Sequence, residues 1–287
     1  MPLVETEAIV LRTYRLAEAD KIVSLLTRQM GRVRAVAAGA QRTKSRYGGA
    51  LESLSYVRIW LYERENRDLG RLNSAEIIES FFDMQKDYSA HLAAQYLAEV
   101  AERVLPEREV NDRVFRLMLA VLRGLKKAVR SNGLTAGPAH GSRGGAADSA
   151  EKTAEESAPG ASVALAGGIE RPLLYFDYWF LKVAGVLPDL AHCASCGQPL
   201  LEAFYGSTSD GLLCSACRSS ATPYKLGQEA LAVAVPLRES SPDAWFALRQ
   251  PGGPVSQLRR FLEKLIEFHA ERKLITRELL EQDADLL

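Results

Sequence analysis

The feature that most constrains the fold of this chain is the placement of its four cysteines. They form two C-x-x-C pairs, Cys193–Cys196 and Cys214–Cys217, with residues 197–213 between them and no cysteine left over. This spacing is typical of a four-cysteine zinc ribbon. Two thiolates three positions apart cover one side of a metal ion, and a second pair completes a tetrahedron without an open coordination position. The pattern therefore predicts one structural Zn²⁺ and argues against catalysis by the metal.

Two disulfides or a thiol redox centre are the alternatives for these cysteines. The chain begins Met1-Pro2-Leu3-Val4-Glu5, which lacks the basic start and the apolar run of a secretory signal. A reducing cytosol disfavours disulfides, and a redox C-x-x-C usually stands alone in a βαβ context. His192 adjoins the first cysteine, but four cysteines already fill the metal shell, so we expect a solvated surface histidine.

Size and overall charge set broad limits on the fold and its partners. A chain of 287 residues is long for one core, so two or three units are expected. With 36 basic and 36 acidic residues the net charge is zero, which by itself does not favour nucleic acid. No apolar run approaches the roughly 18 residues that cross a bilayer. We therefore expect a soluble cytoplasmic protein with no membrane partner.

The basic residues are not spread evenly, however. The segment from Arg28 to Ala50 holds six basic residues and no acidic one. Residues 39–49 have glycine at both ends and basic residues between, which is typical of a mobile loop that contacts phosphates. The alternative is an ordinary solvated surface loop. The six basic residues are Arg28, Arg32, Arg34, Arg42, Lys44 and Arg46.

Residues 1–80 have the pattern of a small β domain of about five strands. Four strands are predicted at Thr6–Tyr14, Lys21–Thr27, Gly31–Ala38 and Ser55–Glu63. In the last of these, Val57, Ile59 and Leu61 alternate with a second set and are expected to face the core. The absence of a long crossover helix favours a closed barrel such as an OB-fold. The second set is Tyr56, Arg58, Trp60 and Tyr62, which suits either base stacking or packing under a partner domain.

Residues 81–130 and 169–287 have helical periodicity and predict a helical domain. Apolar stripes run over residues 92–104, 114–125, 173–183 and 258–268. The zinc ribbon, residues 190–220, is inserted between these helices. Residues 131–168 are dominated by Gly, Ala, Ser and charged residues, so we expect a disordered insertion. The predicted fold class is α+β and multidomain: an OB barrel followed by a helical domain that carries the ribbon.

Catalytic motifs are absent from the sequence. There is no G-x-x-x-x-G-K-[ST] phosphate loop, G-x-G-x-x-G, H-E-x-x-H or G-x-S-x-G. Glu18 and Asp20 could pair as nuclease metal ligands, but acids at this spacing are common at turns. We therefore expect a protein that is not an enzyme.

The N-terminal region contains a set of short motifs that are specific in combination. They are Glu18-Ala19-Asp20-Lys21-Ile22-Val23, Met30-Gly31-Arg32-Val33 and Leu72-Asn73-Ser74-Ala75-Glu76, with shorter matches between them. Together they resemble the bacterial recombination mediator RecO. The later helices and the four-cysteine ribbon match the zinc-bearing branch of that family. The resemblance implies an OB barrel on a helical domain with a zinc finger. Residues 131–168 are not part of the family pattern.

The resemblance also implies a function without catalysis. Proteins of this kind bind single- and double-stranded DNA, anneal complementary strands, and act with RecR and the single-stranded-DNA-binding protein SSB to help load RecA. It implies a cytoplasmic, nucleoid-associated protein. It also places the SSB C-terminal tail on the helical domain, where Arg123, Lys126 and Lys127 are nearby basic residues. The residues that we carry over as expected DNA contacts are Arg32, Arg34, Arg42, Lys44 and Arg46, with Arg12 and Arg15 as further candidates.

The main rival to DNA binding is a protein-interaction scaffold. In that reading the barrel binds a partner protein, and the face with Tyr56, Trp60 and Tyr62 is the interface. The zero net charge is compatible with this rival.

Overall fold

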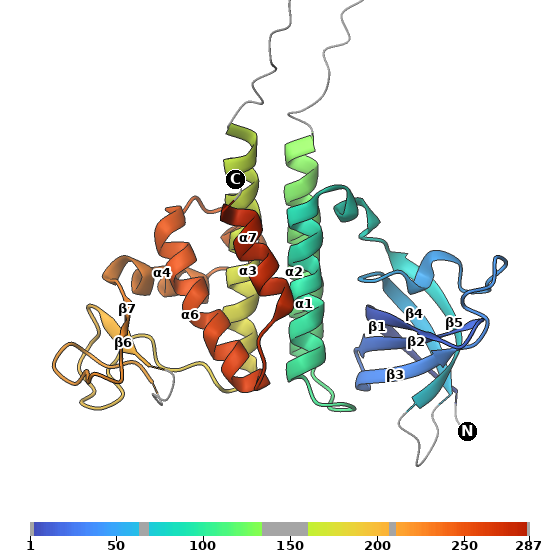
Figure 1. Cartoon of the computed structure of the whole chain (residues 1–287), viewed down its shortest axis with the longest axis horizontal. Coiled ribbons are helices and arrows are strands. Elements are labelled where there is room, and N and C mark those ends of the chain that lie inside the picture. Colours follow the sequence, from blue (N-terminus) through green and yellow to red (C-terminus); the bar gives the residue numbers. More distant parts are fainter. Residues whose placement is uncertain (1–2, 63–68, 134–159, 207–210, 286–287) are drawn as a thin grey trace, which may run out of the picture.

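A computed structural model describes residues 3–62, 69–133, 160–206 and 211–285 of the protein. It consists of a β-barrel, a helical bundle and a small ribbon, with the bundle between the other two (Figure 1). The ribbon is inserted in the chain between the third and fourth α-helices. This arrangement confirms the fold class predicted from the sequence.

The barrel is closed and follows the strand order β1-β2-β3-β5-β4. Neighbouring strands are antiparallel except β3 and β5, which pair in parallel through Arg34–Val36 and Leu69–Arg71. Four predicted strands are confirmed within a few residues, and β5 was not located in the sequence analysis. The bounds are β1 Leu3–Leu16, β2 Asp20–Thr27, β3 Gly31–Ala37, β4 Tyr56–Tyr62 and β5 Leu69–Glu79, with a 3₁₀ turn, η1, at Gly48–Leu51.

Alternation along β4 places the barrel core as the sequence predicts. Val57, Ile59 and Leu61 are fully buried inside the barrel. Because successive side chains of a strand point to opposite faces, Arg58, Trp60 and Tyr62 lie on the outer face. Inward and outward residues of β3 alternate in the same way.

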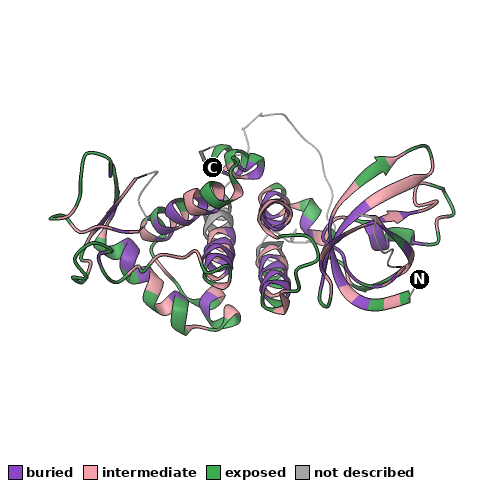
Figure 2. Cartoon of the chain, turned by 90° about the horizontal axis from the view of Figure 1, so that it is seen from below, coloured by how far each residue is buried: buried purple, intermediate pink, exposed green. Residues whose placement is uncertain are grey.

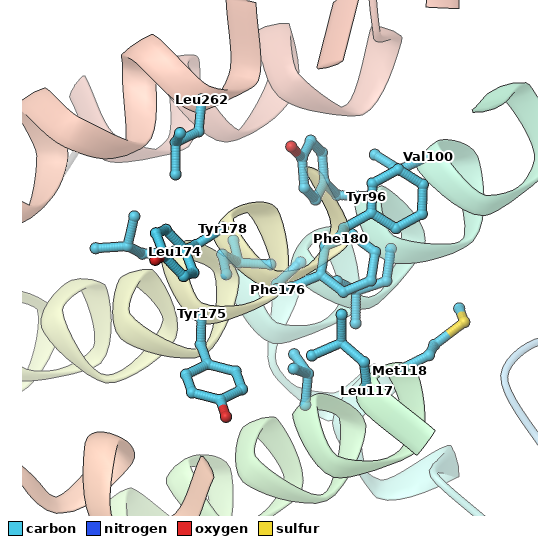
Figure 3. Close-up of a cluster of buried hydrophobic side chains, with 14 of the residues drawn as sticks. Tyr96, Val100, Leu117, Met118, Leu174, Tyr175, Phe176, Tyr178, Phe180 and Leu262 are labelled. Atoms are coloured by element: carbon cyan, nitrogen blue, oxygen red, sulfur yellow. The ribbon is translucent and has the colours of Figure 1, made fainter. Parts of the chain in front are cut away.

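The helical bundle contains the larger core. Phe176 and Phe180 stack with their ring centroids 5.3 Å apart and lie near Tyr96, Val100 and Leu262 from neighbouring helices (Figure 3). The helices are α1 Tyr88–Val104, α2 Asp112–Gly133, α3 Gly160–Val183, α4 Gln228–Glu239, α5 Pro242–Ala247, α6 Gly252–Ala270 and α7 Ile275–Asp285, with a 3₁₀ turn, η2, at Phe82–Lys86 before α1. The ribbon strands are β6 Ala203–Tyr205 and β7 Tyr224–Leu226, so the ribbon continues past residue 220, where the sequence analysis ends it.

The barrel and the bundle share a buried apolar cluster. Ile9, Leu11 and Tyr56 of the barrel belong to the same buried cluster as α1 and α2. The Tyr56 ring meets the Phe115 ring edge-on, with the centroids 6.1 Å apart. In Figure 2, buried residues line the facing sides of the helices and the inside of the barrel, whereas the ribbon is mostly exposed or half-buried.

Helices α2 and α3 extend into the segment that the sequence analysis predicts to be disordered. Residues 131–133 continue α2, and residues 160–168 begin α3. The prediction weighed the lack of large apolar side chains, but alanine is a strong helix former, and residues 160–168 contain Ala161, Ala164 and Ala166. Residues 134–159 lie outside the described residues.

Among the helices of the described residues, none combines the length and the apolar character that crossing a bilayer requires.

Candidate nucleic-acid interface and metal centre

The four cysteines meet in the ribbon as a single cluster. Their sulfur atoms all lie within 4.8 Å of one another. The Sγ atoms of Cys196 and Cys214 are 3.7 Å apart. In a tetrahedral site with metal–sulfur distances of about 2.3 Å, two sulfurs are roughly 3.8 Å apart. The cluster therefore has the donors and the spacing to hold one metal ion.

Each C-x-x-C pair is shaped by the same backbone turn. The Cys193 carbonyl accepts from the N–H of Gly197 at 2.9 Å, and the Cys214 carbonyl accepts from the N–H of Arg218 at 3.0 Å. Gly197 has a φ of +72°, in the left-handed region that favours glycine. Two bonds between the backbones of Phe204 and Leu213, at 2.8 and 2.9 Å, pair these two residues in an antiparallel bridge.

The cysteines are electrostatically unequal without a metal. Backbone N–H groups of Cys196 and Cys214 lower the pKa of Cys193 to about 6. A hydrogen bond with Ser195 lowers the pKa of Cys217, but the neighbouring cysteines outweigh it and raise this pKa to about 12. A thiophilic cation that bound all four thiolates would offset this unfavourable effect of the cysteines on one another. His192 lies outside the cluster, exposed, with Nδ1 2.9 Å from Oδ2 of Asp189.

Arg32 and Arg34, two of the expected DNA contacts, face the connection between α1 and α2. Nη1 of Arg32 and Nε of Arg34 lie 3.2 and 2.8 Å from the same Oε1 of Glu107. Nε of Arg32 also donates to the Leu105 carbonyl at 2.9 Å. The backbone N–H of Arg108 donates to the Arg32 carbonyl at 2.9 Å. A phosphate would have to displace Glu107 to reach either guanidinium group.

Two more arginines of the barrel pair with acids of the bundle. Arg28 lies 2.9 Å from Asp112 and 3.0 Å from Glu7, and Arg12 lies 3.4 Å from Glu102. The segment from Arg28 to Ala50 has no acidic residue of its own, but the fold brings acidic residues from elsewhere in the chain against its arginines. We call the contacts of Arg12, Arg28, Arg32 and Arg34 with Glu102, Glu107 and Asp112 the interdomain clasp.

Of the remaining expected contacts, Arg15 lies near the end of β1 and the other three lie on the loop after β3. Arg42, Lys44 and Arg46 are exposed. Within the described residues, Arg42 and Lys44 make no ion pair. Nη2 of Arg46 donates to the Tyr47 hydroxyl at 3.0 Å, and its guanidinium lies 5.1 Å from the centre of the Tyr47 ring. These three side chains form an exposed cationic surface that a polyanion can reach, and we call it the basic loop.

The basic loop is fixed at both ends, which the sequence analysis did not foresee. At its start, the Gln41 amide donates to the Asp20 carbonyl at 2.7 Å and accepts from Arg15 Nε at 3.0 Å. A carboxylate oxygen of Asp20 accepts from the Gly39 N–H at 2.8 Å, so Asp20 has a structural role here. At its end, Tyr47 is buried. In the sequence, Gln41 and Tyr47 each adjoin one basic residue, and that pattern does not distinguish an anchor from a solvated side chain.

On the bundle, Arg123, Lys126 and Lys127 line a cavity of about 330 Å³ together with Arg130 and Pro242. Three of these basic side chains already form ion pairs with acidic residues. Arg123 and Lys126 lie 2.8 and 3.2 Å from the Glu79 carboxylate at the end of β5, and Lys127 lies 2.6 Å from Asp243.

The aromatic residues on the outer face of β4 differ in what covers them. Tyr56 is covered by the bundle, as the packing alternative required. Trp60 and Tyr62 remain half-buried on the barrel surface. Arg71 of β5, which the sequence analysis did not single out, is paired with Tyr62 across the strands and is exposed. Its place beside Tyr62 depends on the β4–β5 register.

Together these parts define a modular class of protein. An OB-like barrel offers a cationic loop suited to a polyanion, and a helical bundle carries a four-cysteine ribbon that can bind a metal ion.

Comparison with known proteins gives the family. The model described as "Recombination protein O N terminal" matches residues 1–81, and "Recombination protein O C terminal" matches residues 85–136 and 164–278. The DNA repair protein RecO of Koribacter versatilis is 37% identical and covers 98% of this chain and 99% of its own length. The DNA repair protein RecO of Nocardioides sp. is 36% identical, and the match covers 77% of this chain and 78% of the length of that protein. The chain therefore belongs to the RecO family, whose members act in DNA repair and recombination.

Proposed function

We propose that this protein binds single- and double-stranded DNA, anneals complementary strands, and acts with RecR and SSB to help load RecA. The basic loop is the observation that carries the DNA-binding part. Arg42, Lys44 and Arg46 are exposed on a fixed loop of the barrel, where cations hold backbone phosphates without reading sequence. Annealing requires only that two polyanions are neutralised enough to approach, so the proposal includes no catalytic step.

The proposed metal is a single structural Zn²⁺. The four thiolates suit a soft or borderline cation, and four sulfur ligands would fill the tetrahedral shell of zinc without a bound water. When bound, the metal would join the two C-x-x-C turns and supply no chemistry to DNA.

The cavity on α2 is the proposed place for the acidic C-terminal tail of SSB. It presents four cations, Arg123, Lys126, Lys127 and Arg130, around Pro242. The tail would compete for these side chains with Glu79, Asp243 and Asp83, the last of which pairs with Arg130.

The experiment is the annealing of two complementary oligonucleotides, followed by fluorescence at two salt concentrations, with and without SSB on one strand and with Mg²⁺ present. We expect faster annealing that survives SSB coating, with both strands intact. In the Arg42→Ala/Lys44→Ala/Arg46→Ala variant, binding to single strands should weaken. The slope of log affinity against log salt should fall by about 2, at roughly 0.7 per phosphate contact.

A matched control removes the same number of charges from the bundle. The Arg260→Ala/Arg272→Ala/Lys273→Ala variant changes three exposed cations far along the chain from the basic loop. Equal losses in both triple variants would reject the basic loop as the contact surface. No acceleration by the wild-type protein would favour a protein-interaction scaffold, a reading that the neutralised arginines of the clasp support.

A further inference from the structure

The outer face of the barrel carries a short aromatic and cationic strip beside the basic loop. Trp60 and Tyr62 lie on the outer face of β4, and Arg71 lies opposite Tyr62 on β5. Leu3 of β1 lies opposite Tyr62 on the other side and is 47% exposed. Arg71 is exposed and, within the described residues, makes no ion pair. Its charge therefore remains available to a ligand.

The strip is continuous with the basic loop through β5. Arg46 donates to the Tyr47 hydroxyl, and that hydroxyl donates to the Leu72 carbonyl at 2.9 Å. Leu72 follows Arg71 directly and lies one residue beyond the last β3–β5 pair, Val36 with Arg71. The phenol of Tyr47 thus places the Arg46 guanidinium two hydrogen bonds away from the strand that carries Arg71.

The opposite end of β4 is unsuited to a polyanion. Arg58 lies 3.5 Å from Glu5 and is flanked across the strands by Glu7 and Glu76. The cationic character of the face therefore ends near Trp60, which itself lies opposite Glu5 and Ser74. A ligand that follows the cations would run from the basic loop across Arg71 to Tyr62 and Trp60.

We propose that Trp60, Tyr62 and Arg71 form a base-stacking strip that binds single-stranded DNA in preference to duplex. The inference rests on the proposed DNA binding and deepens it. Aromatic rings stack on bases of any sequence, and such contacts need bases that are not already paired and stacked in a duplex. Arg71 would hold the phosphate between two stacked bases, and the basic loop would hold the neighbouring phosphates of either kind of DNA.

Trp60 provides a direct readout. The protein has three tryptophans, and Trp60 is the one in the barrel, since Trp179 and Trp245 belong to helices of the bundle. The difference in emission between the wild type and Trp60→Phe isolates the Trp60 signal. Titration with an oligo-dT strand should quench that signal, whereas a blunt duplex of the same length should leave most of it.

Affinities of the variants provide the second readout. Trp60→Ala and Tyr62→Ala should each weaken oligo-dT binding about tenfold, at about 1–3 kcal/mol for one base stack, and leave duplex affinity nearly unchanged. Arg71→Ala, which removes no packed ring, should weaken single-strand binding as well. Tyr88→Ala is the matched control because Tyr88 is an exposed aromatic residue at the start of α1, outside the strip. Circular dichroism confirms that each variant is folded.

The outcomes separate this inference from the proposed function. If the wild type binds neither DNA, both are wrong. If it binds both DNAs through the basic loop but Trp60 is not quenched and the aromatic variants bind oligo-dT normally, the strip alone is rejected. Parallel losses for single strand and duplex would also overturn the proposed preference.

Discussion

Glu99 is a buried carboxylate that attaches the last helix to the bundle. Its two oxygens accept from the backbone N–H groups of Ile275 and Thr276 at 3.1 and 2.9 Å and from the Thr276 hydroxyl at 2.5 Å. Arg103 lies 2.7 Å away on the same helix. A carboxylate from α1 thus satisfies donors at the start of α7, where a helix has free N–H groups and a favourable dipole for a negative charge.

Replacing Glu99 by glutamine should destabilise the protein in a pH-dependent way. Burial raises the pKa of Glu99, but the bonds from Thr276 and Ile275 and the charge of Arg103 outweigh it, so the pKa is lowered. The stabilisation is therefore present above the unfolded value of about 4.3 and is lost as pH falls through the lower folded value. We expect Glu99→Gln to cost about 1–3 kcal/mol at pH 7 and much less once the pH falls below the lowered pKa of the folded state.

Urea unfolding at several pH values measures this difference. Glu278→Gln is the control because Glu278 is exposed on the same helix α7, and it should cost little at any pH. A cost for Glu99→Gln that stays constant from neutral to acid pH would show that its charge is not the source of the stabilisation.

Among the elements, the ribbon has the least apolar support. Its strands β6 and β7 are each three residues long and form a two-stranded sheet. Few of its side chains are buried, among them Ala203, Phe204 and Leu212. A segment with so small a core needs a cross-link or a metal to hold one conformation.

Loss of the cysteine ligands should therefore unfold the ribbon and spare the rest of the protein. In Cys193→Ser/Cys214→Ser we expect bound zinc to fall from about one per chain to near zero, with rapid proteolysis within residues 190–220. Ser220→Ala, a change at an exposed ribbon residue that is not a ligand, should leave both unchanged. Elemental analysis and limited proteolysis, with and without a chelator, measure the two effects. Equal protease resistance in metal-free and metal-bound protein would contradict the structural role.

For the whole molecule, the shared core and the interdomain clasp predict that barrel and bundle unfold together. Tyr56 packs on Phe115 inside one buried cluster. The clasp adds ion pairs, such as that of Arg32 with Glu107. A backbone hydrogen bond from Arg108 to Arg32 also joins β3 to the α1–α2 connection. Gly31 allows this approach. Its φ is +68°, and a Cβ there would lie 2.1 Å from the Glu109 carbonyl oxygen.

Hydrogen exchange near the midpoint of urea unfolding tests this coupling. In the wild type, barrel and bundle peptides should exchange with the same free energy. Gly31→Ala should push the α1–α2 connection away, cost about 1–3 kcal/mol through strain, and let the barrel open first. Gly49→Ala has no atom within 4 Å of its added Cβ and serves as the control. Separate opening of barrel and bundle in the wild type would refute the coupling.

The sequence by itself determined most of the barrel strands, the long helices and the cysteine cluster. Local periodicity is set by the backbone, so alternation located Val57, Ile59 and Leu61 in the barrel core, and apolar stripes located the long helices. Two C-x-x-C pairs are each local, and no other cysteine competes for the metal. Their convergence was therefore predictable from spacing alone.

Only the tertiary structure decided which charges and rings are free to bind. Arg32 and Arg34 look unpaired in the sequence because their partner, Glu107, lies more than 70 positions away along the chain. Tyr56 is covered while Trp60 and Tyr62 are not, because the bundle packs over one end of β4. Electrostatic pairing and burial depend on distance in space, and the fold sets that distance through contacts that no local pattern encodes.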